Sequence, residues 1–357
     1  MRFDIVSLGD HLPDPHTKKF NETQAERVKF WVEMGVQAER NGYDTYWLGE
    51  HHCSDYIISV PQMLLSAVAV RTNRIRLGTA VSLLPNNDPV RMAEDFATLD
   101  LLSNGRAEIG FGGGFTEHTF KLFGQDLSKS AEMSQENLNL LQVLWNQNEI
   151  NWEGKFRAPI HESRLQPRTF SGRSIPINRA VAATQATARS AGLEGHKLMV
   201  MTVAGRFADF RPLAEIYRAA YKEAGHDPAG MSVSALAYVH VQRDGNAARS
   251  FWHPYRDNYR AFTKALTDAK GLTAGVKAFN EKLGAARFAV RESDFCGSPA
   301  EVTGQILKAY EDFGGFDCLI VFPDAGGIAG PDVLASNELF AQTVIPEVRA
   351  ALGKRAA

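Results

Sequence analysis

The chain has 357 residues, of which 44% are hydrophobic and 22% are charged, and its formal net charge is -2. A charge this close to neutrality excludes a global basic field, so we expect neither nucleic acid nor an anionic membrane as the main partner but a small molecule. Cys53, Cys296 and Cys318 are widely separated and odd in number, which favours a reducing compartment, the cytoplasm. The N-terminal apolar run is too short for a signal peptide or a membrane span.

The predicted elements alternate between strand and helix along the whole chain. Apolar runs of strand length occupy 3–8, 43–48, 75–81, 107–111, 175–180, 197–202, 232–241 and 316–322. Helical spacing and capping residues predict helices over 24–40, 61–70, 89–102, 133–145, 186–193, 211–224, 299–313 and 331–352. Eight such strand–helix units predict an α/β fold, a closed parallel (β/α)8 TIM barrel.

Two segments are longer than ordinary barrel loops. They are 152–173 and 242–294, and the second is predicted to be a largely helical insertion before the last strand. An insertion of this length can form a wall or lid of the active site, and a structural or dimer-contact role is equally open. No Gly/Ser/Pro linker or composition break divides the chain, so we expect a single domain over 1–357.

Glu50, His51 and His52 directly follow the second predicted strand. Active sites of α/β barrels lie at the carboxyl ends of the strands, and histidine titrates near neutral pH, so these residues are candidates for acid–base or hydrogen-bonding chemistry. A satisfied structural pair is the alternative. A metal site with Cys53 is disfavoured, because neighbouring residues of an extended segment point to opposite faces and no second pair has zinc spacing.

Several motifs in order resemble one known family. They are Glu50-His51-His52, RLGTAV at 76–81, DPVRMAED at 88–95 and LDLLSNGR at 99–106. The sequence is similar to the luciferase-like flavin monooxygenases, and most of all to the α subunit of bacterial luciferase. The likeness spans nearly the whole chain, because it continues through Phe123-Gly124 and through 297–301.

The resemblance implies a usually dimeric (β/α)8 barrel that binds a reduced flavin or deazaflavin at the carboxyl ends of its strands. In the monooxygenase branch, reduced FMN from a separate flavin reductase reacts with O2 to give a C4a-hydroperoxide. That adduct attacks a carbonyl or another oxidisable carbon. We therefore expect an FMN-dependent monooxygenase, a homodimer, that acts on a small organic, carbonyl substrate.

The resemblance also implies roles for individual residues. His51 matches the family's catalytic histidine, His52 its neighbour and Glu50 the acid that precedes them. Ala80-Val81 falls where relatives have a non-proline cis peptide packed against the isoalloxazine ring; a simple strand bulge is the alternative. Physically, an imidazole at this place can hydrogen-bond the reacting oxygen or assist proton transfer.

At the phosphate end, Ala183, Thr184 and Thr187 match the loop that cradles the FMN phosphate in relatives. These residues open a predicted helix, and free N–H groups at a helix N-terminus suit a dianion. Gly112 stands where bacterial luciferase has a reactive cysteine, so we expect no thiol chemistry there. The glycine run from 110 to 114 lacks the third glycine of a dinucleotide fingerprint.

Two phosphate-binding arginines of the family are missing from this sequence, since Gly113 and Ala131 occupy their positions. Losing two charge-assisted contacts should weaken FMN binding unless Lys129, Arg179 or Arg189 substitutes.

Tyr255 falls where relatives place an aromatic ring over the flavin and the substrate, although helix packing explains such a residue equally well. Two other functions remain open. One is hydride transfer with the deazaflavin F420, whose anionic tail needs cationic groups along a groove. The other is a non-catalytic partner chain like the β subunit of luciferase. The intact His51-His52 pair argues against the second.

Overall fold

The computed structural model of the protein describes residues 1–114, 116–268 and 292–356. Eight parallel strands form a closed barrel, because β8 pairs with β9 at the end of the order β9-β11-β1-β2-β3-β4-β7-β8. The strands are β1 (Arg2–Ser7), β2 (Thr45–Leu48), β3 (Arg76–Leu83), β4 (Ala107–Gly112), β7 (Ile177–Val181), β8 (Lys197–Val200), β9 (Val233–Val241) and β11 (Cys318–Phe322). Each lies within two residues of its predicted limits, which confirms the TIM barrel.

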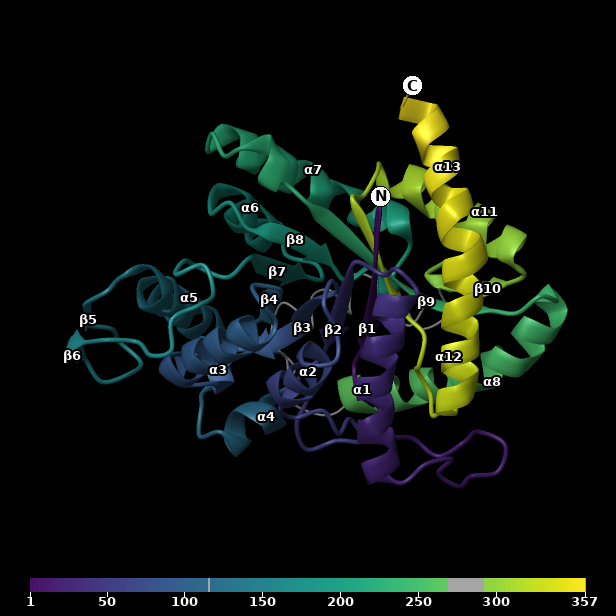
Figure 1. Ribbon diagram of the computed structural model, residues 1–357, viewed down its shortest axis with the longest axis horizontal. Coiled ribbons are helices and arrows are strands. Elements are labelled where there is room, and N and C mark those ends of the chain that lie inside the picture. The colour runs from purple at the N-terminus through teal and green to yellow at the C-terminus, as the bar shows by residue number, and fades with distance from the viewer. Residues whose placement is uncertain (115, 269–291, 357) are drawn as a thin grey trace.

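Helices surround the strands, as Figure 1 shows. They are α1 (Gln24–Arg40), α2 (Pro61–Ala69), α3 (Pro89–Leu102), α5 (Ser130–Asn146), α6 (Gln185–Leu193), α7 (Phe207–Glu223) and α11 (Pro299–Phe313). The capping boxes at Thr23 and Ser298 are both present, which confirms two predicted helix starts. The predicted last helix is α12 (Gly330–Leu339), the π-helical η5 (Phe340–Val344) and α13 (Ile345–Ala356).

The core has two parts, one outside the barrel and one inside it. Phe3 faces outward, and its ring packs edge-on against Phe340 at 5.9 Å between centroids. Trp47 is buried inside the barrel, and its Nε1 donates to Asp4 at 2.9 Å. This alternation along parallel strands covered by helices explains why the strand runs are almost wholly buried.

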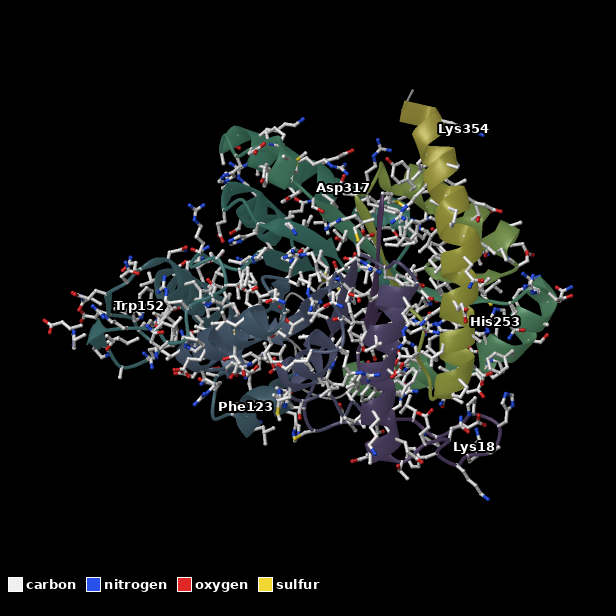
Figure 2. All side chains as sticks on the ribbon, in the orientation of Figure 1. Lys18, Phe123, Trp152, His253, Asp317 and Lys354 are labelled. Atoms are coloured by element: carbon white, nitrogen blue, oxygen red, sulfur yellow. The ribbon has the colours of Figure 1, made fainter. Side chains whose placement is uncertain are left out.

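Four short elements were not predicted. The insertion at 152–173 contributes to an antiparallel hairpin of β5 (Ile150–Trp152) and β6 (Ile160–Ser163), and Figure 2 labels Trp152 on it. α4 (Glu117–Leu122) precedes α5, and β10 (Asp294–Gly297) pairs with the carboxyl half of β9. Elements of three to six residues are too short to show a clear hydrophobic period, so sequence patterns do not distinguish them from loops.

The insertion before the last strand is helical where it is described. α8 covers Gly245–Asp268, whereas residues 269–291 of the predicted insertion lie outside the described residues. Tyr259 of α8 packs edge-on against Tyr238 of β9 and Phe322 at the end of β11, at 5.8 Å and 5.5 Å between ring centroids. α8 therefore lies at the carboxyl ends of these strands, where the sequence placed the active site.

A charged layer lies at the opposite, amino end of the barrel around Glu108, which is only 1% exposed. Its carboxylate is ion-paired with Arg76 and, at 3.1 Å, with Lys197, and it accepts from Asn178 Nδ2 at 2.8 Å. Burial works to raise the pKa of Glu108, but Lys197, Arg76 and Asn178 outweigh it and hold that pKa below its usual value.

We expect Glu108→Gln to lower the free energy of unfolding by about 3 kcal/mol at pH 7, because it leaves two cations without their partner. The folded-state pKa of Glu108 lies below that of the unfolded chain. The contribution is therefore present at neutral pH and is lost as the pH falls through the folded-state pKa. Urea unfolding at several pH values measures both effects.

The control is Glu94→Gln on α3, whose carboxylate pairs with Arg91 at the surface and should contribute less than about 1 kcal/mol. Equal losses of unfolding free energy in Glu108→Gln and Glu94→Gln would contradict the stabilising role of the charged layer around Glu108.

Candidate active site

Glu50 connects the carboxyl ends of β2 and β3. Its carboxylate accepts from the backbone N–H of Leu83 at 3.1 Å, from Asn87 Nδ2 at 2.9 Å and from His52 Nε2 at 2.9 Å. Glu50 is 4% exposed, and its own N–H donates to the carbonyl of Val81 at 3.2 Å. With its oxygens engaged by three donors, Glu50 positions its neighbours rather than offering a free base.

His51 points an unused nitrogen into the interior. Its Nδ1 is buried and makes no hydrogen bond with any described residue. The ring is stacked on Tyr56 with 4.0 Å between centroids and 24° between planes. Burial, and to a lesser extent the neighbouring His52, lowers the pKa of His51 to about 4 and outweighs a backbone hydrogen bond with Leu8 that raises it. His51 is therefore a neutral imidazole at physiological pH, with one nitrogen open to a ligand.

Tyr56 is itself held from across the strand ends. Its hydroxyl lies 2.6 Å from that of Tyr259 on α8, and both side chains are buried. The sequence analysis assigned no function to Tyr56 or Tyr259. Tyr56 follows His51 by five residues, and nothing in the local pattern indicates that their rings stack.

His52 lies nearer the surface. Its ring meets that of Phe123 edge-on at 4.7 Å, and Phe123, which follows α4, is 39% exposed (Figure 2). Because a carboxylate can only accept a hydrogen bond, the Nε2 of His52 carries the proton in its contact with Glu50. The predicted trio is thus brought together in distinct environments. His51 is half-buried with its Nδ1 enclosed, His52 is half-buried beside the exposed Phe123, and Glu50 is buried between the ends of β2 and β3.

The Ala80-Val81 peptide bond is cis, as the resemblance implied. The pairing of β3 with β4 also shifts register between Thr79 and Ser82, so the alternative, a strand irregularity, is present as well. Val81 faces β4, where a Cβ added to Gly112 would lie 3.0 Å from Val81 Cγ2. Ala80, Val81 and Gly112 therefore form one surface beside Glu50 and His51.

The predicted phosphate residues lie at the ends of the neighbouring strands β4 and β7. The carbonyl of Gly113 accepts from Ser130 Oγ at 2.5 Å. Thr184 is the N-cap residue of α6, but its side chain is exposed and makes no capping hydrogen bond. Ala183 and Thr187 are half-buried on either side of it.

The three cations considered as substitutes for the missing arginines already have carboxylate partners. Lys129 is 3.6 Å from Glu132, Arg179 is 3.6 Å from Glu194, and Arg189 is 2.9 Å from Glu223. The guanidinium of Arg179 also stands over the ring of Phe111 at 5.0 Å.

Tyr255 belongs to the packing between α8 and the loop after β1. Its hydroxyl donates to Asp14 at 2.7 Å, and the side chain is 6% exposed. The aromatic residues of α8 that contact Tyr56 of the stacked His51-Tyr56 pair are Tyr259, one helical turn later, and Phe262.

Two buried carboxylates at the ends of β1 and β11 were not predicted. Asp324 pairs with Arg27 at 3.4 Å, and Asp10 accepts from the N–H groups of Gly326 and Gly327 at 2.9 and 3.2 Å. Burial and the nearby Asp324 raise the pKa of Asp10 to about 7. The pair fixes the loop after β11 against which α8 packs.

Within the described part of the chain, no group of three or more histidines, cysteines and acids is placed to bind a metal. None of the described helices is long and apolar enough to cross a membrane.

Known proteins share this architecture. The chain is 25% identical over 358 residues to the alkanal monooxygenase alpha chain of Photorhabdus laumondii, covering 96% of this chain and 97% of that one. The crystal structure of monooxygenase RslO1 from Streptomyces bottropensis superposes with a TM-score of 0.82 at 24% identity, covering 97% and 99% of the two chains.

Structures with two different cofactors are also similar in fold. The oxygenating constituent of 3,6-diketocamphane monooxygenase from Pseudomonas putida, in complex with FMN, has a TM-score of 0.74 at 20% identity and covers 96% and 99%. An F420-dependent secondary alcohol dehydrogenase has a TM-score of 0.72 at 16% identity and covers 97% and 98%. At such identities the likeness establishes the fold alone.

The family model described as luciferase-like monooxygenase matches residues 1–316. This match covers most of the chain, and the strand-end histidines and the cis peptide stand where the resemblance placed them. The chain therefore belongs to the luciferase-like monooxygenase family.

Proposed function

We propose that the protein is a monooxygenase that uses reduced FMN, delivered by a separate flavin reductase, and O2 to oxidise a small organic carbonyl substrate. The observation that carries the proposal is His51, just after the carboxyl end of β2, whose buried Nδ1 makes no hydrogen bond with a described residue and whose lowered pKa keeps the ring neutral. Membership of the monooxygenase family supports it.

We assign the planar cofactor to the surface formed by Ala80, Val81 and Gly112. A side chain at Gly112 would press on Val81, so the glycine lets the end of β4 pack closely against the cis-peptide segment. Bound reduced flavin supplies two electrons to O2, so that one oxygen atom enters the substrate and the other leaves as water. The protein's task is to position the reactants and to exclude water.

His51 suits the handling of the reacting oxygen. A neutral imidazole can donate from one nitrogen and accept at the other, and it adds no charge to an apolar site. We assign this role to Nδ1 of His51, and we assign Glu50 and His52 to positioning, because their contacts to each other and to Asn87 fix the backbone before His51.

Aromatic side chains close the site on one side. Tyr56, Tyr259 and Phe262 pack together, with 4.9 Å between the rings of Tyr56 and Phe262 and 6.1 Å between those of Tyr259 and Phe262. Such apolar walls shield a reactive flavin from water, which is the protective function that a monooxygenase needs.

F420-dependent hydride transfer is the alternative. The anionic tail of F420 requires unpaired cations along its path, whereas Lys129, Arg179 and Arg189 already face carboxylates. This favours flavin. The buried, partner-free nitrogen of His51 likewise favours an enzyme over a non-catalytic partner chain.

We further infer one domain over 1–357 that works in a reducing cytoplasm. Arg349 near the C-terminus donates to the carbonyl of Met1 at 3.2 Å and pairs with Asp44, so both ends belong to the same body. The three cysteines are free thiols.

We also infer a homodimer formed through α2 and α3. Large apolar side chains on this face are exposed, with Met63 at 70% and Val70 at 66%, and Leu101 and Leu102 add to them. A cluster of exposed apolar residues marks a surface that is covered by a partner, and a second copy of the chain is the partner that the family expectation supplies.

The role of His51 can be tested by substitution. We expect His51→Ala to bind reduced FMN within about threefold of the wild type but to oxidise substrate at least about 100-fold more slowly, with the O2 lost as hydrogen peroxide. Anaerobic titration measures binding, and product and peroxide assays measure coupling. His161→Ala, on the exposed β6, is the control. If His51→Ala forms product and releases peroxide in the same ratio as the wild type, His51 does not handle the reacting oxygen.

Substitution of Tyr259 tests whether its hydroxyl positions Tyr56 and thereby keeps His51 buried. Tyr259→Phe removes the hydroxyl that holds Tyr56, so water should reach the His51 ring and its pKa should rise from about 4 towards 6.5. The pH profile of oxidation, flat from pH 8 to 6 in the wild type, should then bend near pH 6.

Tyr255→Phe makes the same chemical change one turn away on α8 and releases only Asp14, so it should leave the profile flat. Identical profiles for all three proteins would show that Tyr259 does not position His51.

The proposed dimer can be tested by measuring the mass of the protein in solution. Light scattering should give twice the chain mass at micromolar concentration, and Met63→Glu should yield monomers because it places a charge in an apolar contact. Leu193→Glu, on the exposed part of α6, should remain dimeric. A monomeric wild-type protein would refute the proposed interface.

A further inference from the structure

Three neutral polar side chains gather around the glycines at the end of β4. A Cβ added to Gly113 would lie 3.0 Å from Ser130 Oγ and 3.5 Å from Ser134 Oγ, both on α5. A Cβ added to Gly114 would lie 3.7 Å from Oδ1 of Asn86, which ends η1 (Leu84–Asn86). We call Asn86, Gly113, Gly114, Ser130 and Ser134 the β4 pocket.

Two of these side chains are buried without any partner. Ser134 is 5% exposed and Asn86 is 7% exposed, yet neither Ser134 Oγ nor either amide atom of Asn86 makes a hydrogen bond with a described residue. Buried polar groups are nearly always hydrogen-bonded, so three such atoms around one glycine pair indicate a ligand that carries hydroxyl or other polar groups.

The charged side chains around the β4 pocket are paired with opposite charges. The described cations on the elements around it already face carboxylates: Lys129 and Lys155 face Glu132, Arg157 faces Asp88 at 3.3 Å, and Arg179 faces Glu194. Hydroxyl and amide groups hydrogen-bond neutral and charged oxygens alike, whereas cations discriminate strongly in favour of phosphate.

The β4 pocket adjoins the place proposed for the flavin ring. Gly112, which contacts Val81, immediately precedes Gly113, and the ring surface and the pocket are therefore continuous along one strand end.

We propose that the β4 pocket binds the ribityl chain of the flavin through neutral hydrogen bonds and does not recognise the terminal phosphate by charge. The protein then takes riboflavin about as well as FMN. This inference rests on the proposed flavin-dependent function. The remaining phosphate contact, at the exposed N-terminus of α6, gives FMN at most about a fivefold advantage.

The test is to measure the dissociation constants of FMN, riboflavin and lumiflavin by anaerobic fluorescence and absorbance titration. We expect FMN and riboflavin to agree within about fivefold, and lumiflavin, which has no ribityl chain, to bind at least tenfold more weakly. FMN binding more than 50-fold tighter than riboflavin would overturn the inference but leave the proposed function intact. Failure of all three flavins to bind would instead refute the proposed function.

Variants locate the contact. Ser134→Ala should weaken the binding of FMN and of riboflavin by the same factor, about three- to tenfold, and leave the binding of lumiflavin unchanged. It should not lower the thermal midpoint of the ligand-free protein, because the hydroxyl has no partner to lose. Asn139→Ala, on the exposed side of α5, is the matched control and should change the affinity for neither FMN nor riboflavin. Unchanged affinities in Ser134→Ala would overturn the assignment of the pocket.

Charge variants test neutrality directly. Lys129→Met should change FMN affinity less than threefold, whereas Ala131→Arg, on the exposed first turn of α5, should tighten FMN about tenfold without affecting riboflavin. A tenfold loss of FMN binding alone in Lys129→Met would show that a cation does recognise the phosphate and would overturn the inference.

Discussion

The buried carboxylate of Glu50 is the interaction on which the site depends. It is a single anion that accepts from the backbone of β3, from Asn87 and from His52, and it thereby joins the ends of two strands. Charge-assisted hydrogen bonds of this kind are about twice as strong as neutral ones. They hold the irregular end of β3, with its cis peptide, against the segment that carries His51.

A second constraint comes from α8, which extends the site beyond the barrel. The Tyr56–Tyr259 contact presses an aromatic ring onto His51, and the same ring contributes to the burial that keeps the imidazole neutral. The chemistry assigned to His51 thus depends on a residue more than 200 positions later in the chain. The buried pair of Asp10 and Asp324 supports this arrangement, because it fixes the loop on which α8 rests.

The two ends of the site differ in how they treat charge. At the amino end of the barrel, Glu108 is surrounded by two cations and an amide, which is a stabilising network remote from the chemistry. At the carboxyl end, beside Gly113, the hydroxyl of Ser134 and the amide of Asn86 have no hydrogen-bond partner among the described residues. This contrast separates the layer that holds the barrel together from the surface that is available for a ligand.

The sequence alone determined the eight barrel strands, the principal helices and the position of Glu50, His51 and His52 at a strand end. These features are local, since apolar runs, capping boxes and turn residues act over a few positions. The family resemblance added the cis peptide at Ala80-Val81, which no local pattern predicts. The short β10 and the β5–β6 hairpin were missed, because three or four residues carry no reliable period.

Only the tertiary structure decided which groups meet. It selected Tyr259 and Phe262, rather than Tyr255, as the residues of α8 that contact Tyr56, whose ring stacks on His51. It also paired Lys129, Arg179 and Arg189 with carboxylates. It also left Asn86 and Ser134 without partners beside Gly113. Contacts between distant segments depend on how the elements pack, and burial and pKa follow from that packing, so no pattern along the chain could have supplied them.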